Sequence, residues 1–330
     1  MLANKPLKAA KAARTARASS ATFEATAREW IAMHKPQWSE AHHARELRNL
    51  DKDLFPYLGP RLVRDIEPVE LLAVVRRVEA RGALVAASRV LSTARGVFLY
   101  AVATARAPRD ITPDLKRALK PHTKKNLPAI INPAELAGLL RASDGYKGGP
   151  VVRAALALAP LLFQRPGNLR TMKWQDVDLQ SRLWSIPSED MKRTKEAKLN
   201  GHPHVVPLPT QAVAILQELH HLTGYGAYVF PGLRNPKAPM SEAGVSAALN
   251  ALGYKGIHTW HGYRATGRTL IRQVLNYPKD AIEAQLAHVG QITHGGAYDR
   301  GNHLEERKRM IQDWADYLDR IRILSREPNC

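Results

Sequence analysis

The chain has 330 residues, 45% of them hydrophobic and 24% charged, which is the composition of a globular protein rather than a disordered one. Its 49 Lys and Arg residues outnumber 30 Asp and Glu, and the net charge of +19 indicates either a polyanionic partner such as nucleic acid or simply a basic surface. The apolar stretch 154–163 is far shorter than the ~20 residues of a membrane span, and the single cysteine, Cys330, excludes an internal disulfide or a thiolate zinc site and fits a reducing compartment.

Residues 1–21 carry five basic residues and no acid. The basic spacing imitates an organelle transit peptide, but the segment has neither the apolar face of such a peptide nor the apolar centre of a secretory signal. We expect a solvated basic tail or helix.

Residues 22–115 predict a small all-helical domain. Apolar residues at helical spacing begin with Phe23, and Ser39 is a candidate cap for a second helix that stops at Phe55-Pro56. Pro68 suits the first turn of a third helix, which Gly82 ends, and a fourth helix covers 84–103.

A basic linker over 116–131 separates this domain from a second one over 132–330. Asn132-Pro133 predicts a helix start, 151–163 a buried helix that contains Pro160, and 183–186 with 205–208 a long-looped hairpin. Helices are further expected at 241–252, 262–274 and 304–321. The fold class is therefore mainly α with a small β-sheet (α+β).

Several short motifs follow one another in the second domain. Each alone has little specificity, but together they place a set of chemically active side chains in a fixed order: Arg165, Lys192, His261, Arg264, His288 and Tyr298. This order resembles the catalytic set of the tyrosine recombinase (phage integrase) family.

The surrounding sequence strengthens the resemblance. The stretches QRPGNLRTMKWQDVDL (164–179), HGYRATGRTL (261–270) and QLAHVGQITHGGAYDR (285–300) look like integrases of genomic islands and satellite phages, and the segment from Thr22 is similar to their core-DNA-binding domain. The resemblance covers about 22–320 and implies a helical core-binding domain followed by a mixed catalytic domain. Related integrases often carry a further amino-terminal domain for arm-type DNA sites, and we expect this chain to start after it.

The resemblance implies a phosphodiester transfer without metal or cofactor. Arg165 and Arg264 would hold the non-bridging phosphate oxygens, since guanidinium groups bind them bidentately. Tyr298 would form a covalent phosphotyrosine, Lys192 would act as general acid, His261 in acid–base exchange and His288 as a hydrogen-bond donor to the phosphate.

Two features depart from the pattern or extend it. Asn168 stands where related proteins commonly have Glu, so we expect at best a neutral hydrogen bond orienting Arg165. Gly295 and Gly296 precede Tyr298 and would let its segment swing, whereas His294 reads as an exposed polar residue. The remaining histidines show no metal-binding spacing, and Trp260 reads as support for the site.

DNA-backbone contacts are expected from basic residues of the linker and the hairpin: Lys116, Arg117, Lys120, Lys124, Lys125, Lys195 and Lys198. The implied partners are double-stranded attachment sites, three further copies in a synaptic homotetramer and DNA-bending accessory proteins, in the cytoplasm at the nucleoid. The apolar face of 304–321, which includes Met310, Trp314 and Leu318, would pack either on its own domain or, as the resemblance favours, on a neighbouring protomer. Two other functions stay open at this point, a type IB topoisomerase and a non-catalytic DNA-binding regulator.

Overall fold

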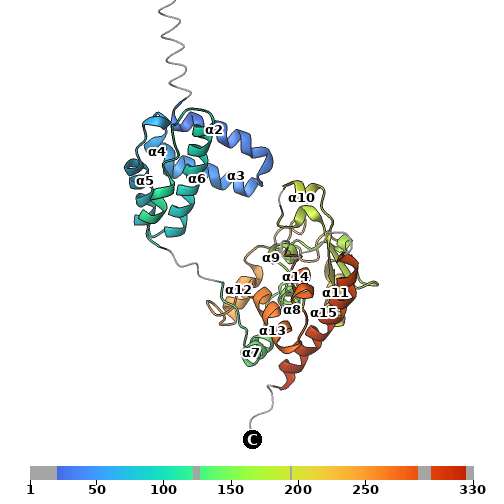
Figure 1. Cartoon of the computed structure of the whole chain (residues 1–330). Coiled ribbons are helices and arrows are strands. Elements are labelled where there is room, and N and C mark those ends of the chain that lie inside the picture. Colours follow the sequence, from blue (N-terminus) through green and yellow to red (C-terminus); the bar gives the residue numbers. More distant parts are fainter. Residues whose placement is uncertain (1–20, 122–126, 194, 289–298, 325–330) are drawn as a thin grey trace, which may run out of the picture. The chain divides into compact units, whose positions relative to one another are not determined.

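The computed structural model describes residues 21–121, 127–193, 195–288 and 299–324. Backbone packing divides the chain into two units, with the main division between Lys125 and Asn126 (Figure 1). Each unit has its own hydrophobic core.

The first unit is helical throughout, as predicted. Thr22 and Ser39 cap their helices by accepting hydrogen bonds from the amides of Ala25 and His42, and Gly82 follows the end of α5 with φ +78°. Its elements are α2 (Phe23–His34), α3 (Glu40–Asn49), a π-helical turn (Leu50–Leu54), α4 (Phe55–Leu58), α5 (Pro68–Ala80), α6 (Leu84–Ala103) and the 3-10 helices Lys35–Gln37, Val63–Asp65 and Pro113–Ala118.

The predicted stop at Phe55-Pro56 is wrong. Helical turns continue through the π-helical turn into α4, where Pro56 lies in the first turn. Proline is tolerated there because the amide it lacks would have no intrahelical partner. The continuation buries Leu54 and Leu58 in the first core.

Packing extends into both ends of the predicted linker. Leu119 packs against the first core, and the amide of Lys120 donates to Glu79 Oε1 at 2.7 Å. At the other end, Ile130 is buried in the second core. Only the middle of the predicted span 116–131 therefore lies outside the described packing.

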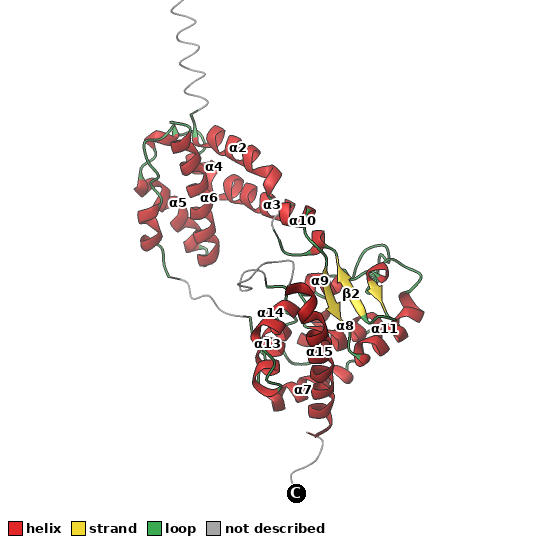
Figure 2. Ribbon diagram, turned by 45° about the vertical axis from the view of Figure 1, so that its right-hand side comes forward, coloured by secondary structure: helices red, strands yellow, loops and turns green. Residues whose placement is uncertain are grey.

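The second unit combines helices with one small sheet (Figure 2). Asn132 caps α7 as predicted, with Oδ1 accepting from the amides of Ala134 and Glu135. Its helices are α7 (Pro133–Asp144), α8 (Pro150–Leu162), α9 (Pro166–Arg170), α10 (Lys195–Leu199), α11 (Thr210–Thr223), α12 (Gly244–Ala251), α13 (Gly262–Val274), α14 (Lys279–Gln285) and α15 (Asp299–Leu324), with 3-10 helices at Trp174–Asp176 and Ser188–Asp190.

The sheet is antiparallel with the order β1-β2-β3. Its strands are β1 (Val177–Asp178), β2 (Leu183–Ile186) and β3 (His204–Pro207), and Trp184 lies opposite Val206 with both side chains in the core. The predicted hairpin is β2 and β3. Strand β1 was not predicted, because its two residues are too few to show an alternating pattern.

Helix α15 packs against α7, α8 and β3, and Figure 2 shows it beside α7 and α8. Met310, Trp314 and Leu318 are buried in the core of their own unit, and Trp314 Nε1 donates to the carbonyl of Pro160 at 2.9 Å. The expectation that this face docks on a neighbouring protomer is therefore wrong. The side chains are already covered by α7 and α8.

Replacing Trp314 by Ala is expected to lower the free energy of unfolding by about 3–5 kcal/mol, because it opens a cavity against Phe163 and removes the bond to Pro160. Urea unfolding followed by circular dichroism measures the change. Ile323→Ala, on the same helix but 67% exposed, is the control and should change stability by less than about 0.5 kcal/mol. A Trp314→Ala effect as small as that of the control would contradict the burial of Trp314 in the second core.

Candidate active site

Arg165 lies where α8 turns into α9. Phe163 ends α8 in the left-handed conformation (φ 38°, ψ 36°), and Arg165 is the residue before the first turn of α9. Its guanidinium is half-buried, and burial together with the charge of Arg193 lowers its pKa. Arg165 therefore has a cationic neighbour, Arg193, which directly follows Lys192 and was not among the predicted site residues.

Arg264 lies in the first turn of α13 and is buried. Its Nη1 donates to the carbonyl of Phe163 at 3.2 Å, and its Nη2 donates to the carbonyl of Leu286 at 2.8 Å and to His288 Nε2 at 3.0 Å. Burial and the charge of Arg165 lower its pKa to about 10, so it is still a cation at neutral pH. Two loops distant in sequence thus hold one guanidinium in place.

His261 immediately precedes α13 and is solvent-accessible. Partial desolvation lowers its pKa, and the nearby charges of Arg264, Arg165, Lys192 and His288 lower it further. All five of the predicted catalytic residues that the structure describes therefore gather at one place, although they come from α9, the hairpin, α13 and the end of α14.

Lys192 is exposed on the loop between β2 and β3. Asn168 Nδ2 donates to the carbonyl of Asp190 at 2.8 Å, two residues before this lysine, and Arg193 Nη1 donates to Ser188 Oγ and to the carbonyl of His202. The expectation that Asn168 orients Arg165 is replaced by a different contact, because its amide reaches the hairpin. Asn168 connects the loop of Lys192 to the helix that follows Arg165.

His288 follows α14, where Ala287 has φ +50° and turns the chain back. Its amide donates to the carbonyl of Glu283 at 3.1 Å, and its Nδ1 lies 2.5 Å from Glu283 Oε2. Sequence reasoning missed Glu283. A spacing of five residues does not place two side chains on the same face of a helix or a strand. The turn at Ala287 is what brings the two side chains together.

Tyr298, His294, Gly295 and Gly296 lie outside the described residues. Helix α15 begins at Asp299, and its buried Arg307 donates from Nε and Nη2 to Gln285 Oε1 and from Nη2 to the carbonyl of Val205. These bonds connect the helix that follows Tyr298 to β3 and to the segment of His288.

The basic residues proposed for DNA contacts are described only in part. Arg117 and Lys120 are exposed and Lys198 is partly exposed, while the structure describes the backbone but not the side chains of Lys116 and Lys195. Lys124 and Lys125 lie outside the described residues. The DNA contacts of all seven therefore stay predictions.

The residues that enter the second unit are clamped to the segment before α13. The amide and hydroxyl of Thr259 donate to the carbonyl of Pro128, and the amide of Ile130 donates to His258 Nδ1 at 3.0 Å. Thr266 Oγ1 donates to the carbonyl of Ile130 at 2.6 Å. A Cβ on Gly262 would lie 2.5 Å from the carbonyl oxygen of Pro128, so glycine is required for this approach.

This clamp should make stability depend on pH. Burial lowers the pKa of His258 from 6.5 to about 4. The unfolded chain binds the proton more tightly than the folded one. The contribution of neutral His258 to the free energy of unfolding is therefore fully present above pH 6.5, and up to about 3 kcal/mol is lost between pH 6.5 and 4. His258→Asn should reduce this slope, measured as urea midpoints from pH 7.5 to 4, while an unchanged slope would contradict the assignment.

The described residues show neither a metal site nor a membrane helix. No group of three or more His, Cys, Asp or Glu side chains among them could hold a metal ion. Within the same residues, no helix combines the length and the apolar character that a membrane crossing requires.

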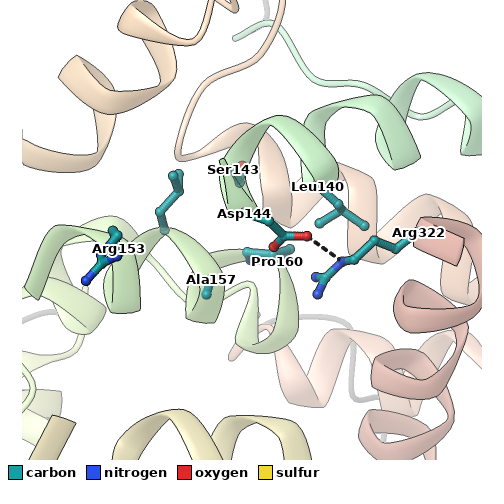
Figure 3. Close-up of a pocket in the computed structure, with 8 residues that line it drawn as sticks. Leu140, Ser143, Asp144, Arg153, Ala157, Pro160 and Arg322 are labelled. Atoms are coloured by element: carbon teal, nitrogen blue, oxygen red, sulfur yellow. Dashed lines mark ion pairs between the residues drawn. The ribbon is translucent and has the colours of Figure 1, made fainter. Parts of the chain in front are cut away.

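A small cavity of about 140 Å³ lies elsewhere in the second unit, between α7, α8 and α15. Asp144 and Arg322 face each other across it as an ion pair of 3.5 Å (Figure 3). None of the described catalytic candidates lines this cavity. It is therefore separate from the site around His261.

Comparison with known proteins agrees with this arrangement along most of the chain. Residues 23–118 match the phage integrase central domain, and residues 130–302 match the phage integrase family. The integrases of Shigella phage Sf6 and Enterobacteria phage P4 are each 34% identical to this chain, covering 95% and 94% of it and 78% and 72% of their own lengths. A lambda integrase tetramer bound to a Holliday junction has a similar fold, with a TM-score of 0.63 at 17% identity over 86% of this chain and 82% of that one.

The fold, the gathered Arg, Lys and His side chains and these matches define a tyrosine-type site-specific DNA recombinase. The resemblance seen in the sequence motifs is confirmed. The chain belongs to the phage integrase family.

Proposed function

We propose that this recombinase integrates or excises a mobile element by cleaving and rejoining duplex DNA at a defined attachment site through a 3′-phosphotyrosine at Tyr298. The observation that carries the proposal is the convergence of Arg165, Lys192, Arg264 and His288 on His261. Four potential cations around one point suit a phosphodiester, whose reaction develops negative charge on the phosphate oxygens.

Each group has one task in the proposed reaction. The Tyr298 oxygen attacks phosphorus and forms the new O–P bond, while the bond from phosphorus to the 5′ oxygen breaks. His261 accepts the phenol proton, a role that its lowered pKa supports because the ring is then neutral near pH 7. Lys192 donates a proton to the departing 5′ oxygen, and Arg165, Arg264 and His288 bind the non-bridging oxygens.

Four of the described tyrosines are poorly suited to act as the nucleophile. The pKa values of Tyr254, Tyr263, Tyr277 and Tyr317 are all raised, chiefly by burial, and a raised pKa disfavours the phenolate. The assignment of Tyr298 itself rests on the order of the motifs, in which this tyrosine follows His288 by ten residues.

The proposal includes the partners. The lambda integrase relative is a tetramer on a Holliday junction, and we infer a homotetramer for this chain during strand exchange, with DNA-bending accessory proteins at its attachment site in the nucleoid. The basic residues of the linker and hairpin would contact the DNA backbone, so affinity should fall steeply with salt.

The test is trapping of denaturant-resistant DNA. Nicked duplex fragments from the flanks of the gene are incubated with the protein and quenched with detergent, the adduct is digested, and the modified peptide is identified by mass spectrometry. We expect phosphodeoxynucleotide on Tyr298 and one trapped sequence. Scattered trapped sequences would favour a topoisomerase, and tight binding with no adduct on any fragment would favour a non-catalytic regulator.

A further inference from the structure

Four charged or titratable side chains form a continuous chain of contacts at the edge of the site. Arg268 donates from Nε to Glu283 Oε1 at 2.6 Å, and its Nη2 lies 2.5 Å from the same oxygen. The other carboxylate oxygen, Oε2, lies 2.5 Å from His288 Nδ1. His288 Nε2 in turn lies 3.0 Å from Arg264 Nη2.

The arginine donors in this series of contacts determine which ring nitrogen of His288 carries the proton. A guanidinium has only donors, so His288 Nε2 must accept from Arg264 and its proton must be on Nδ1. Nδ1–H then donates to the Glu283 carboxylate, which is ionised: burial alone raises the pKa of Glu283, but the hydrogen bonds and charges of His288 and Arg268 outweigh it and lower that pKa.

Glu283 is almost completely buried, with 4% of its surface exposed. A buried carboxylate beside a phosphate site is costly unless it is paired, and this one is paired on both oxygens. The turn at Ala287 brings Glu283 next to His288, which lies five residues later in the chain. The carboxylate is thus held between Arg268 and His288.

We propose that Glu283 is a positioning residue for strand cleavage, holding His288 in the Nδ1–H form with Nε2 directed toward Arg264 and the phosphate. This inference rests on the proposed function. When the phosphate displaces the Arg264 contact, the carboxylate also offsets the charge that the ring gains if Nε2 takes up a proton, the form that can donate to a phosphate oxygen.

The test is a double-mutant cycle on the rate of covalent attachment to nicked attachment-site DNA. Glu283→Ala should lower the rate about 10- to 100-fold, because a misplaced catalytic group loses that much, while DNA affinity changes less than about twofold. In a His288→Ala background, the same Glu283→Ala change should cost less than about twofold, since the residue acts through the histidine.

The conservative variant Glu283→Gln keeps an amide oxygen that can accept from Nδ1–H, so we expect it to recover part of the rate lost in Glu283→Ala. Should Glu283→Ala fail to fold by circular dichroism, the cycle of Glu283→Gln with His288→Ala carries the test. Glu306→Ala is the matched control, because Glu306 also contacts a histidine, His303 Nδ1 at 3.2 Å, but lies on α15 outside the site. Its rate should equal that of the wild type.

The outcomes separate a failure of the inference about Glu283 from a failure of the proposed function. Additive losses from Glu283→Ala and His288→Ala, or no loss from Glu283→Ala, overturn the inference. A Tyr298→Phe variant is measured in parallel. If it still forms an adduct, the proposed function fails instead, whereas loss of its adduct together with additivity at Glu283 leaves the function standing and removes only the role of Glu283.

Discussion

Tyr298→Phe is expected to bind attachment-site DNA as tightly as the wild type and to form no covalent adduct, a loss of at least about 10⁴-fold in cleavage rate. The ring is kept, but the phenyl group has no oxygen to bond to phosphorus. Detergent-resistant DNA on nicked substrates measures the first property, and gel-shift titration at fixed salt measures the second.

Tyr277→Phe is the matched control for this experiment. Its hydroxyl donates to Asp313 at 2.6 Å on α15, and the pKa of Tyr277 is raised to about 12. Removal of that hydroxyl costs one hydrogen bond, about 1 kcal/mol of stability, and should leave cleavage unchanged. Normal cleavage by Tyr298→Phe together with lost cleavage by Tyr277→Phe would move the nucleophile to the described part of the chain.

Arg264→Lys is expected to lower the cleavage rate about 10²- to 10³-fold while the protein stays folded. Lysine keeps the charge but lacks the planar fork, so it cannot reach Phe163, Leu286 and the phosphate together. Single-turnover rates on nicked DNA give the effect, and thermal melting checks the fold.

Arg272→Lys provides the comparison, because Arg272 is exposed near the end of the same helix, α13. Its rate should stay within about twofold of the wild type. If Arg264→Lys cleaved at the wild-type rate, the guanidinium would have a structural role only, and Arg165 would have to bind the phosphate alone.

The sequence alone predicted the helices whose ends depend on nearby capping and turn residues. Helices α6 and α13 begin and end at the predicted residues, and the caps at Ser39 and Asn132 are confirmed. Helix α12 begins at Gly244, three residues later than predicted. The stop at Pro56 failed because proline blocks a helix interior but not a first turn.

The candidate site was selected for a different reason. Arg165, His261, Arg264 and His288 were chosen because their order resembles a known family, and the structure brings them together with Lys192. The sequence did not point to Glu283, Arg193 and Arg307, because their roles depend on contacts that only the folded structure brings about. A buried arginine that bonds to Gln285 and Val205 looks, in the sequence, like any other charge on a solvated helix.

The hydrogen bonds that clamp Pro128 and Ile130 have a mechanical consequence. Force applied along the chain at Leu127 would reach Thr259, two residues before His261, through bonds to the Pro128 carbonyl, and would reach α13 through Thr266. These bonds come before any apolar side chain of the second core along that route, since Ile130 is the first. A displacement of Pro128 would therefore act on the turn before His261 as well as on the second core.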